Sequence, residues 1–213
     1  MTGLLLTHCL PDDVTNHRTN APPVCQGAPG PTSPVEEGRV VAIALGANLG
    51  DAAGTLRDAI TELSAGPALQ GAVVSGLYGT APVGPPQPDF LNAVLVARTS
   101  WEPHRLLRWL QQIEGAHGRQ RDVRWGPRTL DLDLLFVGDS VLCDEALTLP
   151  HPGVASRGFV LVPLCDVLPD AVHPTLGVSF RTLLARWRLR TASPDRQVWT
   201  VRPPSLPIAE VAA

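Results

Sequence analysis

Apolar runs and helical periodicities alternate through the middle of the chain. Runs of apolar residues bounded by turn-forming residues predict four strands, at Val40–Leu45, Val73–Tyr78, Phe90–Thr99 and Leu130–Val137. Two helical periodicities separate them: Leu56–Leu63, after a predicted turn at Gly46–Asp51, and Leu106–Ile113, capped by Thr99 or Ser100. The order β-α-β-β-α-β predicts an α+β domain of the ferredoxin-like kind with a mostly antiparallel sheet.

Extra C-terminal elements and two polar ends complete the predicted organisation. After the fourth strand we expect a helix from Arg157 to Leu164, a short strand near Val172, a helix from Phe180 to about Arg188, and one more short strand from Gln197 to Val201. Residues 1–38 contain six prolines and no hydrophobic period, which indicates a disordered leader or a misassigned start. The single domain is therefore placed at residues 39–190, followed by a tail at residues 191–213.

The candidate chemistry lies in the segment Arg119–Phe136. Four arginines (Arg119, Arg121, Arg124 and Arg128) precede a D-x-D pair, Asp131 and Asp133, inside an apolar strand. Because side chains alternate along a strand, both carboxylates point to one side, roughly 6 to 7 Å apart. Paired carboxylates favour a cation between them, and Mg²⁺ takes one or two carboxylates together with phosphate oxygens. Arginine forks match phosphate oxygens, so the segment predicts a metal–polyphosphate site.

Each half of this pattern also has an ordinary structural explanation. A D-x-D alone is more often a solvent-facing strand edge or a turn, and an arginine cluster alone is usually a solvated face or a nucleic-acid patch. The flanking leucines make this strand too apolar for a free edge. The adjacency of the two patterns therefore favours the phosphate–metal interpretation.

Composition narrows the chemistry further. The chain has 213 residues, a formal net charge of −3 and 17 basic residues, all of them arginine. Without lysine, a Walker-A loop, a kinase strand lysine or a Schiff-base mechanism is excluded. The net charge argues against a whole-molecule grip on nucleic acid. The four cysteines show no C-x-x-C pair, and no apolar run approaches the ~20 residues of a membrane helix, so we expect a cytoplasmic protein outside the membrane.

Four motifs in this order resemble the 6-hydroxymethyl-7,8-dihydropterin pyrophosphokinase family of folate biosynthesis. They are A-L-G-A-N-L-G-D, Y-G-T-A-P-V-G…P-D-F-L-N-A, R-W-G-P-R-T-L-D-L-D-L-L-F and P-H-P…R-G-F-V-L-V-P-L, within about Val40 to Leu189. The resemblance implies a ferredoxin-like enzyme that transfers the terminal pyrophosphoryl unit of ATP to the pterin hydroxymethyl group and releases AMP. It implies two Mg²⁺ ions, with ATP and a dihydropterin as partners, and we expect a monomer without nucleic acid or membrane partners.

The resemblance also implies roles for individual residues. Asp131 and Asp133 would hold both metals, and Arg119 and Arg121 would belong to a catalytic lid over the triphosphate. The remaining ATP contacts would come from Glu114, Arg124, Trp125, Arg128, Leu134, Thr148, His151 and Arg157. The pterin would be bound by Thr80, Pro82, Val83, Gly84, Phe90, Asn92, Trp125, Asp131 and Phe159, with the two phenylalanines stacking on its ring.

The chain departs from the family pattern at a few positions. The lid segment between Arg119 and Arg124 is one residue shorter than in other members, Gly79 stands where a basic residue is frequent, and Pro152 where an aromatic can contact ATP. Two alternatives from other classes are an RNA-binding ferredoxin-like module that uses the arginine segment, and a catalytically dead interaction protein. The first should carry exposed aromatics on its central strands, and the second has no need of an intact D-x-D.

Overall fold

The computed structural model describes residues 38–82, 85–119, 126–190 and 198–201. Within these ranges a six-stranded antiparallel sheet has the strand order β5-β1-β4-β3-β8, and β2 also pairs with β4. The strands are β1 (Arg39–Ala47), β2 (Gln70–Val74), β3 (Leu77–Thr80), β4 (Phe90–Thr99), β5 (Asp131–Val137) and β8 (Val198–Val201). This topology confirms the predicted ferredoxin-like, mostly antiparallel fold. The disordered leader predicted for residues 1–38 falls almost wholly outside the described residues and stays a prediction.

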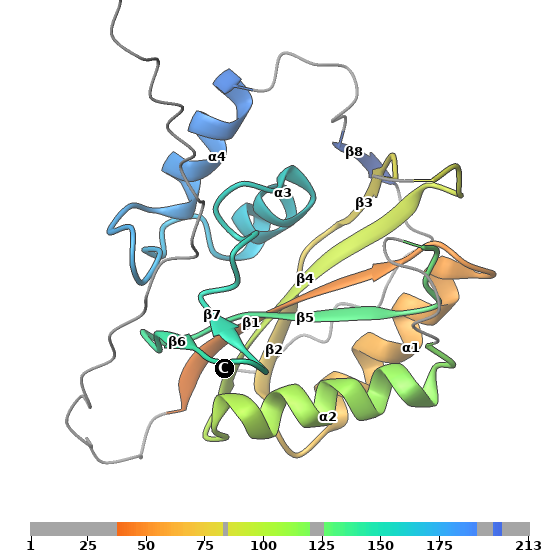
Figure 1. Cartoon of the computed structure of the whole chain (residues 1–213), viewed down its shortest axis with the longest axis horizontal. Coiled ribbons are helices and arrows are strands. Elements are labelled where there is room, and N and C mark those ends of the chain that lie inside the picture. Colours follow the sequence, from red (N-terminus) through yellow and green to blue (C-terminus); the bar gives the residue numbers. More distant parts are fainter. Residues whose placement is uncertain (1–37, 83–84, 120–125, 191–197, 202–213) are drawn as a thin grey trace, which may run out of the picture.

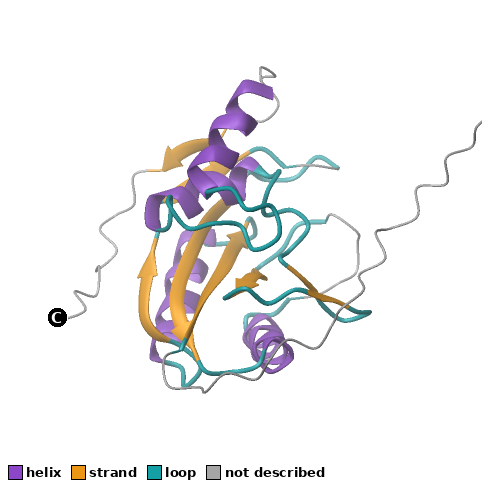
Figure 2. Ribbon diagram, turned by 90° about the vertical axis from the view of Figure 1, so that its left-hand side faces the viewer, coloured by secondary structure: helices purple, strands orange, loops and turns teal. Residues whose placement is uncertain are grey.

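Helices cover both faces of the sheet. Helices α1 (Ala52–Ala65) and α2 (Pro103–Ala116) lie on one face, whereas α3 (Gly158–Val167) and α4 (Phe180–Arg190) lie on the other (Figure 1; Figure 2 gives the arrangement from the side). Each helix buries the stripe that its sequence period supplies. In α1 and α2 this stripe includes Leu56, Leu63, Leu106 and Leu110, all fully buried.

The two faces of the sheet therefore carry two separate cores. Alternation along β1 sends Ile43 and Leu45 toward α1 and α2, and Ala42 toward α3 and α4. On the second face Phe180 of α4 stacks on Phe136 of β5, with ring centroids 5.4 Å apart. On this face β1 carries the small residues Ala42, Ala44 and Gly46, and the last two pair with the start of β5.

Several element boundaries differ from the sequence prediction. Strand β1 continues through Gly46 and Ala47, which were expected to turn, because both pair with β4. The single strand predicted at Val73–Tyr78 divides at Ser75, whose hydroxyl oxygen accepts a hydrogen bond from Val94 N (3.0 Å) in place of a ladder carbonyl. The side chain of Ser75 thus replaces one backbone acceptor at the break between β2 and β3, while the N–H of Ser75 still donates to Val94 O (2.9 Å).

The start of α2 was also predicted too early. The helix begins at Pro103 after the extended residue Glu102, whose side chain makes no capping hydrogen bond. Proline restricts the preceding residue to extended backbone, and its missing N–H suits the first helical position. Thr99, expected to be a cap, instead accepts a hydrogen bond from Trp101 N at 3.0 Å through its hydroxyl.

The C-terminal helices and the last strand follow the predicted order, but the hairpin that precedes them was not predicted. The short hairpin of β6 (Leu142–Cys143) and β7 (Thr148–Leu149) leads into α3, and the strand expected near Val172 is a single bridge to Ser179. The last predicted strand forms β8 against β3. Among the described helices, none has the length and apolar character to cross a membrane.

Candidate active site

The D-x-D pair lies on the face of the sheet that α3 and α4 cover. Strand β5 pairs with β1 so that Asp131 is opposite Gly46 and Asp133 is opposite Ala44. On the other side of β1, Gly46 is opposite Asn92 of β4. Paired residues of an antiparallel ladder point to the same face, so Asp131, Asp133 and Asn92 share one surface. The predicted common face of the two acids is correct.

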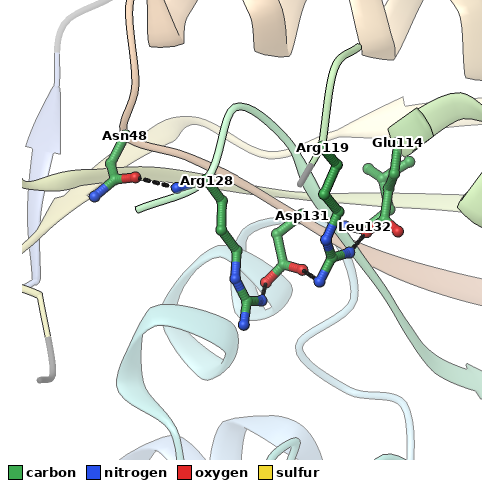
Figure 3. Close-up of polar contacts among 6 residues, drawn as sticks. All are labelled: Asn48, Glu114, Arg119, Arg128, Asp131 and Leu132. Atoms are coloured by element: carbon green, nitrogen blue, oxygen red, sulfur yellow. Dashed lines mark hydrogen bonds and ion pairs between the residues drawn. The ribbon is translucent and has the colours of Figure 1, made fainter. Parts of the chain in front are cut away.

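Two arginines hold Asp131 (Figure 3). Arg128 bonds to Oδ2 of the carboxylate, and Arg119 Nη2 lies 2.7 Å from Oδ1. The side chain of Asp131 is 19% exposed and that of Arg119 is 13% exposed, so water screens this contact only in part. Arg128 is fixed through its backbone as well, because its N–H donates to Asn48 Oδ1 (2.8 Å) and its carbonyl accepts from Asn48 N (3.0 Å). The acid and both cations form one connected group.

Glu114 completes this group from the end of α2. Its side chain is almost fully buried, accepts a hydrogen bond from Leu132 N at 2.7 Å, and forms an ion pair with Arg119 (Figure 3). A buried carboxylate needs such partners because an unpaired charge away from water is strongly unfavourable. The resemblance assigned Glu114 to ATP, and an open pocket of about 310 Å³ beside it is lined by Gln111, Glu114, Gly115 and Arg119. In this structure the carboxylate itself is engaged by the protein.

Asp133 has a different environment from Asp131. Burial, followed by the charge of Asp131, raises the pKa of Asp133 above its ordinary value of 3.8. The charges of His151 and Arg157 act in the opposite direction on that carboxyl group. Burial lowers the pKa of His151, whose Nδ1 accepts a hydrogen bond from Gly153 N at 3.0 Å. Asp133 is therefore a half-buried acid whose charge the surrounding side chains only partly balance.

These properties fit a bound cation. Oδ1 of Asp131 is buried and is paired with Arg119 Nη2 at 2.7 Å, whereas no ion pair with an arginine is found for Asp133 among the described residues. The described residues hold no cluster of three or more His, Cys, Asp or Glu side chains suited to a metal. Two hard carboxylates without further protein ligands suit Mg²⁺, which fills its remaining positions with water and phosphate oxygens.

A second group of predicted residues lies beside the acids. Asn92 is buried, and its amide nitrogen donates to Thr80 Oγ1 (2.9 Å) and, at longer range, to Tyr78 O (3.4 Å). Phe90 pairs with Thr80 across the β3–β4 ladder and is only partly buried. Phe159, in the first turn of α3, is also partly buried, with the Arg157 guanidinium 5.7 Å from its ring centroid. Both rings therefore keep an exposed part, although Phe159 also packs against the second core.

The family model for 7,8-dihydro-6-hydroxymethylpterin-pyrophosphokinase (HPPK) matches residues 42–169 of this chain. The chain belongs to the HPPK family. The Synechocystis protein named 2-amino-4-hydroxy-6-hydroxymethyldihydropteridine pyrophosphokinase is 43% identical over 142 residues, covering 67% of this chain and 73% of the relative. A Bacillus subtilis protein of the same name is 45% identical over 126 residues, covering 59% of this chain and 75% of the relative.

Solved structures support the fold. Wild-type Plasmodium falciparum HPPK-DHPS superposes with a TM-score of 0.56 at 15% sequence identity, covering 74% of this chain and 46% of that chain. The A437G/K540E form with pterin and p-hydroxybenzoate gives a TM-score of 0.57 at 16% identity, covering 74% of this chain and 45% of that chain. This chain therefore spans less than half of those longer proteins, and the likeness concerns the fold alone.

The other residues that the resemblance to HPPK named differ in their burial and in whether the structure describes them. Leu134 is 2% exposed and packs in the core beneath α1 and α2, so only its backbone could reach a ligand. Thr148 is half-buried in β7, and Pro82 is half-buried at the end of the described part of its loop. Five residues lie outside the described ranges, so their predicted roles stay predictions: Val83, Gly84, Arg121, Arg124 and Trp125.

The sequence reasoning gave Asn48 no role in the site. Its amide nitrogen donates to Gln87 Oε1 (3.1 Å) and Pro88 O (2.9 Å), while its oxygen accepts from Arg128 N. One buried side chain thus ties the proline-rich loop before β4 to the segment that carries Arg128. The G-A-N-L-G motif contained the signal, because a buried asparagine after a strand needs several partners.

Proposed function

We propose that this chain catalyses the Mg²⁺-dependent transfer of pyrophosphate from ATP to 6-hydroxymethyl-7,8-dihydropterin, giving the pterin diphosphate and AMP in folate biosynthesis. Membership of the HPPK family supports the reaction. The observation that carries the proposal is the pairing of two same-face acids, Asp131 and Asp133, with arginines on the same surface. A triphosphate bound through Mg²⁺ requires both kinds of group.

Asp131 and Asp133 are the proposed ligands of two Mg²⁺ ions. Bound there, Mg²⁺ would neutralise charge on the phosphate oxygens of ATP and polarise the phosphorus under attack. The raised pKa of Asp133 supports a cation at this position, because it indicates carboxylate charge that the protein leaves partly unbalanced. Arg119 and Arg128 balance one of these acids and could bind phosphate oxygens with their guanidinium forks.

The remaining residues have proposed binding roles. Asn92 and Thr80 would read the polar edge of the pterin, and Phe90 and Phe159 would stack on its faces. Arg157 and His151 would contact ATP phosphates, which is consistent with their electrostatic coupling to Asp133. Pyrophosphoryl transfer needs no covalent protein intermediate, so the protein contributes positioning and charge stabilisation. The lid roles of Arg119 and Arg121 belong to the same proposal.

The setting of the reaction is proposed as the cytoplasm, with the chain acting as a monomer and without nucleic-acid or membrane partners. Both cysteines in the described residues, Cys143 and Cys165, are free thiols, which suits a reducing compartment. Burial raises the pKa of Cys165 to about 11, so this thiol stays protonated at neutral pH and is poorly reactive.

The product decides between pyrophosphoryl and ordinary phosphoryl transfer. With ATP labelled at its β-phosphorus, the label should move to the pterin, and AMP should be the nucleotide product measured by chromatography. Removal of Mg²⁺ with a chelator should stop turnover, and added Mg²⁺ should restore it. The Asp133→Asn variant provides the matched control without turnover. ADP as the main product would refute the proposal.

A further inference from the structure

Gly46 occupies a position that the fold does not require to be glycine. It lies inside strand β1, paired on one side with Asn92 and on the other with Asp131. Its backbone is not in the left-handed region, and a Cβ placed on it would meet only ordinary packing contacts: 3.4 Å to Asn92 Oδ1, 3.9 Å to Asp131 Cβ and 4.0 Å to Phe90 Cδ1. Glycine inside a strand is destabilising relative to alanine, so another reason for it is needed.

Glycine inside a strand usually marks a bulge, a tight bend, or a place where a ligand or another backbone comes close. The register shift between β1 and β5 lies at Ala42/Ile43, not at Gly46, and pairing with both neighbours is regular there. The three atoms nearest the Cβ position all belong to side chains, so no other backbone makes the closest approach. A bound ligand remains as the explanation.

The neighbours of Gly46 indicate which ligand. Three paired residues form one row across β4, β1 and β5. Asn92 contributes an amide that can form hydrogen bonds, Gly46 contributes no side chain, and Asp131 contributes a carboxylate. With neighbouring strands about 4.8 Å apart, the outer two positions are separated by roughly 10 Å. In the next row Ala44 lies between Val94 and Asp133, so the gap in the side-chain layer is specific to Gly46. That span suits a flat two-ring heterocycle whose one-carbon arm points toward the acids.

We infer that Gly46 determines specificity for the flat pterin substrate by leaving the floor of its site without a side chain. The inference rests on the proposed function and extends it to a residue of β1. The pterin ring would lie against the β1 backbone between Asn92 and Asp131. A methyl group at residue 46 would then clash with the ring. The proposed ATP contacts come from arginines and carboxylates and include no atom of Gly46, so ATP binding should not depend on Gly46.

The test is Gly46→Ala, with Gly46→Val as a larger step. Binding of 6-hydroxymethylpterin, measured by titration in the presence of Mg²⁺ and a non-hydrolysable ATP analogue, should weaken about tenfold or more in the alanine variant and further in the valine variant. Affinity for the ATP analogue should stay at the wild-type value. The Tm of Gly46→Ala should be unchanged or raised, because alanine is the better strand residue and its methyl group fits.

Gly76→Ala is the matched control, since a Cβ there would also meet ordinary contacts, 3.5 Å to Asp166 Oδ2 and 3.6 Å to Tyr78 Cε2. It should bind pterin and ATP analogue as wild type does. Wild-type pterin affinity in Gly46→Ala would overturn the inference, as would parallel losses of pterin affinity, ATP affinity and Tm, which would make Gly46 structural. A folded wild-type protein that binds no pterin would instead refute the proposed function itself.

Discussion

At the scale of single residues, Asp131 and Asp133 differ although they share a strand face. Asp131 is held by two guanidinium groups, whereas Asp133 is half-buried beside a like charge, and its partial desolvation and that charge raise its pKa. Ionising an acid whose pKa is raised by folding lowers the free energy of unfolding. That loss begins as the pH rises above the ordinary value of 3.8 and is complete above the folded pKa.

The different environments of Asp131 and Asp133 predict opposite effects on stability when each is replaced by asparagine. Without Mg²⁺ at pH 7, Asp133→Asn should be as stable as wild type or more stable, because it removes the unfavourable charge. Asp131→Asn should lower the free energy of unfolding by about 1–2 kcal/mol, because it weakens two partly buried charge contacts. Urea unfolding measures both, and a turnover assay should find both variants inactive. An Asp133→Asn protein less stable than Asp131→Asn would contradict the assignment.

At the scale of elements, β8 is the edge strand beside β3, and one close side-chain contact accompanies its backbone pairing. Residues Val198–Val201 pair with Leu77–Thr80, and the indole of Trp199 lies directly over Gly79, where any Cβ would collide with the ring. Here glycine lets the tryptophan approach the backbone of β3, the strand that also supplies Thr80.

We expect Trp199→Ala to loosen β8 without disturbing the central strands. Hydrogen exchange of the backbone amides in β8 should become faster, while amides of β1 and β4 keep their protection. Leu189→Ala is the control, because Leu189 is an apolar side chain that is 86% exposed and its loss should change neither region. Unchanged exchange in β8 of the tryptophan variant would mean that backbone pairing alone holds this strand.

At the scale of the whole molecule, the two helix layers enclose separate cores, and a buried histidine supports the second one. His173 is 5% exposed, its ring centroid lies 6.0 Å from that of Phe180, and its Nδ1 accepts hydrogen bonds from Thr175 N and Leu176 N at 3.3 Å. A nitrogen that accepts hydrogen bonds must be unprotonated. Burial accordingly lowers the pKa of His173 below its ordinary value of 6.5.

Acidification should therefore destabilise the protein through His173. Because the pKa is lower in the folded state, the stabilisation is complete above pH 6.5 and is lost as the pH falls from there through the folded pKa. In urea unfolding at pH 7.5, His173→Asn should have a lower free energy of unfolding than wild type. Between pH 7.5 and pH 5.5, its free energy of unfolding should fall by less than that of wild type. Leu189→Ala, which removes an exposed apolar side chain and no titratable group, should keep the wild-type slope. Equal slopes in all three proteins would exclude this role.

The sequence by itself determined the order of the main elements, the ferredoxin-like fold and the family, although it missed the β6–β7 hairpin. These follow from local signals: hydrophobic period separates strands from helices, and alternation alone put Asp131 and Asp133 on one face. The boundary errors have local causes of another kind. Ser75 replaces a ladder carbonyl with its side chain, and Pro103 moves the start of α2, and neither effect is visible in hydrophobic period.

Only the tertiary structure decided which partners each site residue has. Arg119 and Arg128 both pair with Asp131, and Glu114 accepts a hydrogen bond from Leu132 N. Asn48 accepts a hydrogen bond from Arg128 N, which is 80 residues away in the sequence. Such contacts depend on strand register and on how chain segments distant in sequence are brought together, which no local pattern specifies. Gly46 is the clearest case, because a glycine after an apolar run predicts a turn. Only its pairing with Asn92 and Asp131 makes it part of the site floor.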